Sequence, residues 1–273
     1  MQNVKMPLRE KFSHKGTFGK VLNFCGSKNY VGAAYLSSLS SLKIGAGVSA
    51  LSSEECVIKA VSSYLPEVIY FNHKEGLTKL NEFDVVLIGC GLGTSKNSKN
   101  LLQKVLNKIS PQTPLIIDAD GLNLLAQINN QKIIKHENII ITPHPKEASR
   151  LLKCNIKDVL KNLEQSAREL TKKYNCTTVL KTHRTIICSK DLEFFTNLNG
   201  NSALAKSGSG DVLAGIIAGL IAQKMIAYDA CKLGVYLHAK SGEIASEELT
   251  EYSVLASDLL KFLPEAIKTR IDT

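Results

Sequence analysis

Short, largely apolar runs recur along this chain, and each run is bounded by glycine, proline or polar residues. Runs that stay apolar, instead of alternating with polar positions, are typical of strands buried on both faces of a parallel sheet. These runs therefore predict the buried strands of one sheet. They start at Val21, Gly47, Glu67, Asp84, Pro114 and Asn138.

Between and after these runs, apolar residues recur at helical spacing. The clearest case is a face of residues three or four apart, which predicts one long helix from Ile156 to Tyr174. Its members are Ile156, Val159, Leu160, Leu163, Ala167, Leu170 and Tyr174. Strands that alternate with helices predict an α/β fold, with a central, mostly parallel sheet and helices on both faces.

Three further short runs, TTVLK, TIICS and EFFTN, follow that helix closely. Their short connections predict local antiparallel pairing at one edge of the sheet. The last third of the chain predicts three helices: one after Gly210, one from Tyr228 to Leu249, and one from Val254 to about Thr269. Because we find no repeat and no linker, we expect one domain over residues 1–273.

Composition limits the classes of partner. The chain has a net charge of +9, which could serve nucleic acid, a membrane surface or small anions. Its lysines are spread along helix-like segments, it has no tryptophan, and its longest apolar run, 212–222, is too short to span a bilayer. We therefore expect no nucleic-acid or membrane partner. We expect a homo-oligomer that acts on small anionic molecules.

The cysteines bear on the compartment. There are seven, an odd number, and no CxxC pair occurs. This pattern indicates neither a zinc site nor a disulfide framework, and most of these thiols are expected to be buried. The N-terminal segment MQNVKMPLREKF lacks the apolar core of a signal peptide. These features favour a cytoplasmic protein.

The sharpest chemical signal is the segment NGNSALAKSGSGDVLAGIIAGL, which starts at Asn199. Gly208 and Gly210 precede an apolar helix, and residues without side chains leave backbone N–H groups free to bind an anion at a helix N-terminus. Asp211 would lie beside that anion, where a carboxylate is best used as a base for an attacking hydroxyl. The alternative is that Asp211 only caps the helix and the glycines only form a turn.

Other polar residues follow the predicted strands. GCGLGTS, from Gly89, has the spacing GxGxG and not the GxGxxG of dinucleotide-binding folds, so we expect a turn that a ligand can approach closely. His144 stands between two prolines after a strand, where it faces a ligand or is a solvated loop histidine. Three polar residues follow another strand: Asp118, Asp120 and Asn123. We expect them either to orient water, magnesium or a hydroxyl, or to cap a helix.

Together these segments resemble the dehydratase domain of the NAD(P)H-hydrate repair enzymes. The matching pieces run in order along nearly the whole chain: the segment from His14 to Gly47, GCGLGTS, DADGLNLL, TPHPKEASRLL, VLKTHRTII and the GSGD segment. The resemblance implies a ribokinase-like fold. It also implies dehydration of the S forms of NADHX and NADPHX, with ADP or ATP as co-substrate and magnesium as cofactor.

The resemblance also implies roles for individual residues. Those that would contact the hydrated cofactor are Ala33, Gly91, Gly93, His144, Asn199, Asn201 and Asp211, with Asp211 as the catalytic base. Those that would contact the adenine nucleotide are Lys181, Thr182, His183, Arg184, Thr185, Ser209 and Gly210. Many relatives carry an additional N-terminal epimerase domain, which we expect to be absent here because little chain precedes His14.

The match has departures, and other functions stay open. Thr182 stands where the family usually has glycine, Ser209 replaces a threonine, and Lys206 is added before the glycines. One alternative is a ribokinase-like kinase of a vitamin precursor or sugar, which would release a stable phosphorylated product. Another is a nucleotide-binding protein without catalysis, although such a protein has no need of a base at Asp211.

Overall fold

The computed structural model describes residues 4–128 and 136–271. In this part of the chain, strands form one nine-stranded sheet in the order β3-β2-β1-β4-β5-β6-β7-β8-β9. The strands are β1 (Lys20–Phe24), β2 (Val48–Ser53), β3 (Ile69–Asn72), β4 (Val85–Ile88), β5 (Leu115–Ile117), β6 (Ile139–Ile141), β7 (Thr177–Leu180), β8 (Ile186–Cys188) and β9 (Phe194–Thr196).

Pairing within the sheet confirms the predicted arrangement. All pairs from β3 to β7 are parallel, whereas β7–β8 and β8–β9 are antiparallel. The order reverses between β1 and β4, so the loops that follow these two strands diverge, as at the ligand sites of open α/β sheets. One prediction was wrong: β3 is not buried, because it lies at the sheet edge, where Ile69 is 47% exposed.

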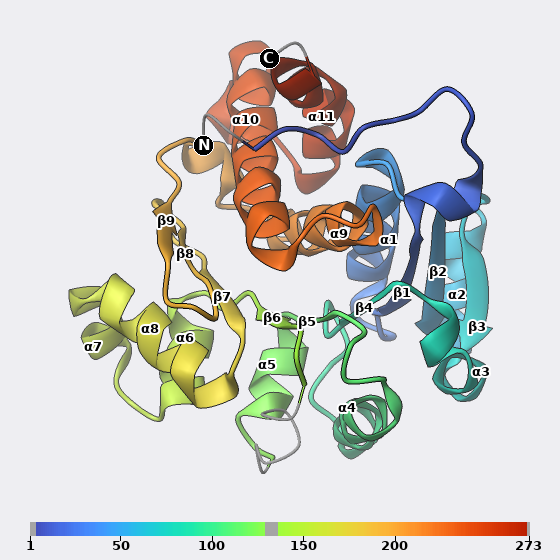
Figure 1. The fold of residues 1–273 in the computed structure, drawn as a ribbon, viewed down its shortest axis with the longest axis horizontal. Helices are drawn as coiled ribbons and strands as arrows, with labels where there is room; N and C mark the ends of the chain where they lie inside the picture. Colours follow the sequence, from blue (N-terminus) through green and yellow to red (C-terminus); the bar gives the residue numbers. More distant parts are fainter. Residues whose placement is uncertain (1–3, 129–135, 272–273) are drawn as a thin grey trace.

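Helices cover both faces of the sheet (Figure 1). One face carries α1 (Val31–Lys43), α2 (Glu55–Ser62), α9 (Ser209–Ala222), α10 (Ala227–Ser253) and α11 (Ala256–Ile271). The opposite face carries α3 (His73–Thr78), α4 (Lys96–Lys108), α5 (Asp120–Leu125), α6 (Pro145–Leu152), α7 (Ile156–Lys161) and α8 (Leu163–Tyr174). Short 3₁₀ turns lie at Lys15–Phe18, Leu80–Glu82 and Ser202–Leu204. No helix in the described ranges is long and apolar enough to cross a membrane.

The predicted long helix from Ile156 to Tyr174 is two helices, so that prediction was wrong in detail. Asn162 has φ −146° and ψ 87°, which interrupts the helix between α7 and α8. The Asn162 side chain then accepts a hydrogen bond from the N–H of Gln165 and caps α8. The apolar spacing continues across this break, which is why periodicity alone does not show it. The three predicted C-terminal helices are confirmed as α9, α10 and α11.

Helix α9 is the most deeply embedded helix on its face and packs closely on α1. Gly215 and Gly219 permit the contact, because a Cβ at Gly215 would lie 2.3 Å from the carbonyl oxygen of Ser37. A Cβ at Gly219 would lie 2.2 Å from Cγ2 of Ile44. These two glycines therefore bring the backbones of α1 and α9 together and fix the position of the N-terminus of α9.

We predict that Gly219→Ala destabilises the protein by about 1–3 kcal/mol, because the added methyl group must displace α1. Urea denaturation would give the free energy of unfolding. Gly32→Ala is the matched control, since a Cβ at Gly32 meets nothing within 4 Å. It should leave stability unchanged or raise it by up to about 1 kcal/mol, the helix-propensity difference between alanine and glycine. Equal effects of both substitutions would contradict the close packing of α1 and α9.

Candidate active site

Three neighbouring strands of the sheet each deliver a polar residue to the same edge. Asp118 follows β5, His144 follows β6, and Lys181 follows β7. Their proximity was not predicted, because the order of the strands had to be known first. At the carboxyl edge, Nζ of Lys181 lies 2.6 Å from Oδ1 of Asp118, whose side chain is 1% exposed. This ion pair joins β5 and β7 across the end of β6.

The same ion pair lies over the N-terminus of α9. The helix is preceded by Gly208, which has φ 90° and supplies no side-chain cap. A Cβ at Gly210 would lie 3.4 Å from Nζ of Lys181 and 3.9 Å from Oδ2 of Asp118. Free backbone N–H groups, the positive end of the helix dipole and the ammonium group of Lys181 therefore converge on one anion-binding site.

The charge state of Lys181 suits this site. Burial favours the neutral amine, but the carboxylates of Asp118 and Glu147 outweigh burial and raise the pKa of Lys181. The side chain therefore stays a cation at neutral pH and can neutralise part of the charge of a phosphate.

Asp211 occupies the first turn of α9, but Gly208 and not Asp211 is the N-cap residue. Burial, with a smaller contribution from the negative charge of Asp118, raises the pKa of Asp211 to about 6. A hydrogen bond from the thiol of Cys90 and the positive charge of Lys181 oppose this shift. A partly buried carboxylate that titrates near neutral pH is suited to accept a proton from a hydroxyl.

His144 borders the larger cavity and is also the N-cap residue of α6, a role that was not considered from the sequence. Its Nδ1 accepts hydrogen bonds from the N–H groups of Lys146 and Glu147, at the start of α6. The carboxylate of Glu147 accepts in return from the N–H of His144 at 2.8 Å. Burial raises the pKa of Glu147 to about 7. Burial, together with the nearby charge of Lys181, lowers the pKa of His144.

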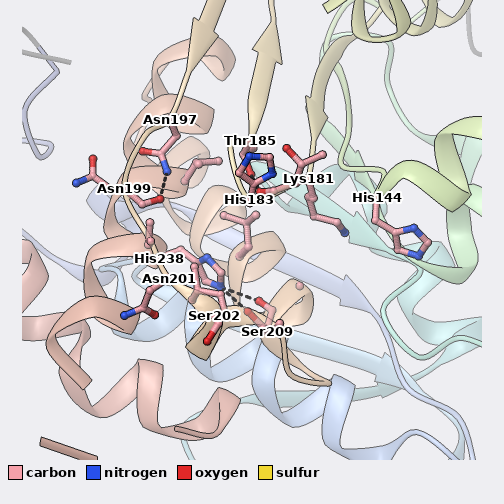
Figure 2. A pocket seen from close by; sticks show the side chains of 18 of the residues that line it. His144, Lys181, His183, Thr185, Asn197, Asn199, Asn201, Ser202, Ser209 and His238 are labelled. Atoms are coloured by element: carbon pink, nitrogen blue, oxygen red, sulfur yellow. Dashed lines mark hydrogen bonds between the residues drawn. The ribbon is translucent and has the colours of Figure 1, made fainter. Parts of the chain in front are cut away.

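A cavity of about 770 Å³ opens beside the N-terminus of α9 (Figure 2). Its walls are the turn between β7 and β8, the loop before α9 and one face of α10. Most of the predicted residues line it: His144, Lys181, Thr182, His183, Thr185, Asn199, Asn201, Ser209 and Gly210. A cavity of this size can hold a nucleotide.

Within the wall, the two predicted asparagines also hold the loop in place. Nδ2 of Asn201 donates to Oγ of Ser246 on α10 at 2.7 Å, and Oδ1 of Asn201 accepts from the N–H of Ala203. Asn199 bonds through its side chain to Glu243, also on α10. Their predicted contacts with a ligand stay predictions.

The remaining predicted residues lie outside this cavity. A Cβ at Gly91 would lie 2.7 Å from Cβ of Ala33, so these two residues form one close contact between the loop after β4 and α1. Gly93 lines a second cavity, of about 340 Å³, between the loops that follow β1 and β4. Its N–H donates to Oδ2 of Asp120 at 2.8 Å. Arg184 is exposed in the turn after β7 and lines neither cavity.

Several residues at the site were not singled out from the sequence. His238 lies within an apolar stretch of α10 and lines the larger cavity. Glu147 resembles an ordinary residue of a helix N-terminus, and Cys90 resembles a buried thiol. Only its position between Gly89 and Gly91 could have indicated Cys90, and no local pattern marks His238.

Comparisons with known proteins show the family of the chain. A family model described as NAD(P)H-hydrate dehydratase matches residues 21–265. The ADP-dependent (S)-NAD(P)H-hydrate dehydratase of Listeria monocytogenes is 32% identical over 272 residues, which cover 98% of this chain and 94% of that protein. The chain spans about half the length of other curated relatives it matches, the bifunctional NAD(P)H-hydrate repair enzymes.

Solved structures match over nearly the whole chain. The ADP/ATP-dependent NAD(P)H-hydrate dehydratase of Bacillus subtilis, co-crystallised with ATP and Mg²⁺, is 31% identical with a TM-score of 0.86, over 97% of this chain and 94% of that one. A ribokinase-like superfamily protein of Enterococcus faecalis is 31% identical with a TM-score of 0.87, over 98% of this chain and 93% of that one. The predicted ribokinase-like fold is thus confirmed, and the chain belongs to the NAD(P)H-hydrate dehydratase family.

Proposed function

We propose that this chain dehydrates the S forms of NADHX and NADPHX to NADH and NADPH, with ADP or ATP as phosphoryl donor. The observation that carries this proposal is the anion-binding N-terminus of α9, where Lys181 and the carboxylate of Asp211 flank Gly210. A phosphoryl group held there has a cation on one side and a proton acceptor on the other. The names of the relatives support the same reaction.

In this proposal the larger cavity holds the adenine nucleotide. Lys181, Ser209 and Gly210 would contact its phosphates, and Thr182, His183 and Thr185, in the turn after β7, line the same cavity. The hydrated nicotinamide ring then lies near Asp211, against the contact between Ala33 and Gly91 and with Gly93 and His144 around it. Asn199 and Asn201 lie in the loop that leads from the nucleotide wall toward α9.

The reaction converts a poor leaving group into a good one. Asp211 accepts the proton of the hydrate hydroxyl as the oxygen attacks the terminal phosphorus of ADP or ATP, and AMP or ADP leaves. The lone pair of the ring nitrogen then expels phosphate, and loss of the proton on the adjacent carbon restores the carbon–carbon double bond. The oxygen of the hydrate therefore ends in inorganic phosphate.

Magnesium fits this site as an ion that enters with the nucleotide. No group of three or more His, Cys, Asp or Glu side chains in the described ranges could hold a metal by itself. Mg²⁺ is commonly bound by substrate phosphates with one or two carboxylates, and Asp118 and Glu147 are the carboxylates beside Lys181 that would complete its shell. Its chemistry would be to neutralise charge on the phosphates.

A cytoplasmic location fits the proposal, since both reactants are metabolites.

The first prediction is the activity itself. Purified protein incubated with Mg²⁺, ADP or ATP, and the S epimer of NADHX should restore the absorbance of NADH at a rate that depends on the nucleotide. AMP or ADP should form in equal amount, because one phosphoryl group is used for each hydrate. If neither nucleotide supports recovery of NADH while the hydrate stays intact, the proposed reaction is wrong.

The second prediction concerns the base. Asp211→Asn keeps the size of the side chain but removes its ability to accept a proton, so kcat should fall by about 100-fold or more. The Kd for Mg-ADP should stay the same or decrease, because a negative charge near the phosphates is lost. In the parent protein kcat should fall as the pH drops below about 6, where Asp211 becomes protonated. Turnover by the Asn variant within a few-fold of the parent would exclude Asp211 as the base.

The third prediction concerns stability and pH. The pKa of Asp211 rises from 3.8 to about 6 on folding. The charged carboxylate therefore lowers the free energy of unfolding, and this loss of stability develops as the pH rises from about 4 to about 6. Asp211→Asn should therefore be more stable than the parent by about 1–3 kcal/mol at pH 8, and the gain should disappear near pH 4. Urea denaturation at several pH values would measure it.

Asp258→Asn provides a control of opposite sign. Burial opposes the charge of Asp258, but hydrogen bonds from Lys261 and the N–H of Leu255 outweigh burial and lower the pKa of Asp258. The stability that this carboxylate contributes is present above its ordinary pKa of 3.8 and is lost as the pH falls through the lowered value. The Asp258 variant should thus be less stable than the parent at pH 8. The same sign for both variants would contradict the raised pKa of Asp211.

A further inference from the structure

A buried histidine supports the first turn of α9 from the side of α10. His238 is 7% exposed, and its Nε2 lies 2.9 Å from the carbonyl oxygen of Ser209 and 3.0 Å from Oγ of the same residue. Figure 2 shows both contacts as dashed lines at the wall of the larger cavity. Ser209 is the residue between the two glycines that open the anion-binding site.

The contact with the carbonyl decides which nitrogen of His238 carries the proton. A carbonyl oxygen can only accept a hydrogen bond, so Nε2 must donate to it. Burial, as the largest cause, lowers the pKa of His238 to about 4, so the ring is neutral at physiological pH. A neutral ring with hydrogen on Nε2 has no lone pair there, and the hydroxyl of Ser209 can only accept from Nε2 as well.

The hydrogen of the Ser209 hydroxyl is therefore free for another acceptor. In the described part of the chain, no other hydrogen bond of this hydroxyl is found. Ser209 lines the larger cavity next to Gly210, on the side that carries Lys181. An anion held by the helix N-terminus would be the acceptor within reach.

We propose that His238 is a positioning residue for nucleotide binding: its Nε2–H holds Ser209 so that the Ser209 hydroxyl donates to a phosphate of the bound adenine nucleotide. This inference rests on the proposed function only in that the larger cavity binds the nucleotide. It needs no assumption about the second substrate. A purely structural role, in which His238 fills space between α9 and α10, makes different predictions for polar substitutions.

The test measures the Kd of Mg-ADP and Mg-ATP by titration calorimetry, without any hydrated cofactor. Ser209→Ala should weaken binding by about tenfold or more, since a hydrogen bond to a charged group is lost. His238→Gln and His238→Asn form a matched pair, because the amide nitrogen of glutamine can reach the position of Nε2 and that of asparagine cannot. The Gln variant should bind within about threefold of the parent, and the Asn variant about as weakly as Ser209→Ala.

The double variant separates an action through Ser209 from an independent effect. If His238 acts through Ser209, His238→Asn adds nothing to Ser209→Ala, and the double variant binds like Ser209→Ala alone. Three results would each overturn the proposal. They are a Kd of the double variant raised by the product of the two single effects, equal binding by the Gln and Asn variants, and parent-like binding by Ser209→Ala. The last comparison needs no His238 variant, so it holds even if the Asn variant fails to fold.

Steady-state kinetics add a readout that a structural role would not move. The substitutions should raise KM for the nucleotide and leave KM for the S hydrate unchanged. Equal increases in both KM values would overturn the proposal. If no NADH is recovered at all while calorimetry gives the expected pattern, the proposed reaction fails and the role of His238 stands.

Discussion

The buried ion pair of Lys181 and Asp118 is the interaction on which the site depends. It joins the ends of two strands that are not neighbours and places an ammonium group over the N-terminus of α9. Without this cation, Asp118, Glu147 and Asp211 would form an acidic cluster that repels phosphate. With it, Asp118 has a paired cation, while Asp211 remains a carboxylate with a raised pKa. One pair therefore separates the roles of carboxylates that lie close together.

The sequence predicts the fold well where local pattern and tertiary structure coincide. Apolar runs gave the parallel strands, and the glycine cluster gave the start of α9, because both signals are local. The pattern failed at Asn162, where a capping side chain breaks a helix whose apolar face continues. The apolar pattern also failed at Ile69. Whether a strand lies at the edge of a sheet depends on the order of the strands, which a local pattern does not show.

Site residues were likewise found from the sequence only where a local motif marks them. Residues in contiguous motifs, such as Gly210 and His144, line the cavity. His238 could not be found in this way, because a single histidine in an apolar stretch of a helix is usually a core residue without a functional role. Its importance depends on Ser209, which is 29 residues away in sequence but in direct contact. Contacts between distant segments are the information that a single sequence does not display.

The glycine-mediated contact of α9 with α1 has a consequence for how the protein can change. In the proposed reaction, a helix packed at this distance would present its field to the phosphoryl group before the nucleotide arrives, so little reorganisation energy would be needed. Adaptation to a different phosphoryl donor must then come from surfaces that are not locked, such as the exposed turn at His183 and Arg184 and the exposed loop at Lys206. Under the proposed function, discrimination between ADP and ATP could therefore evolve in these loops without altering the residues around α9.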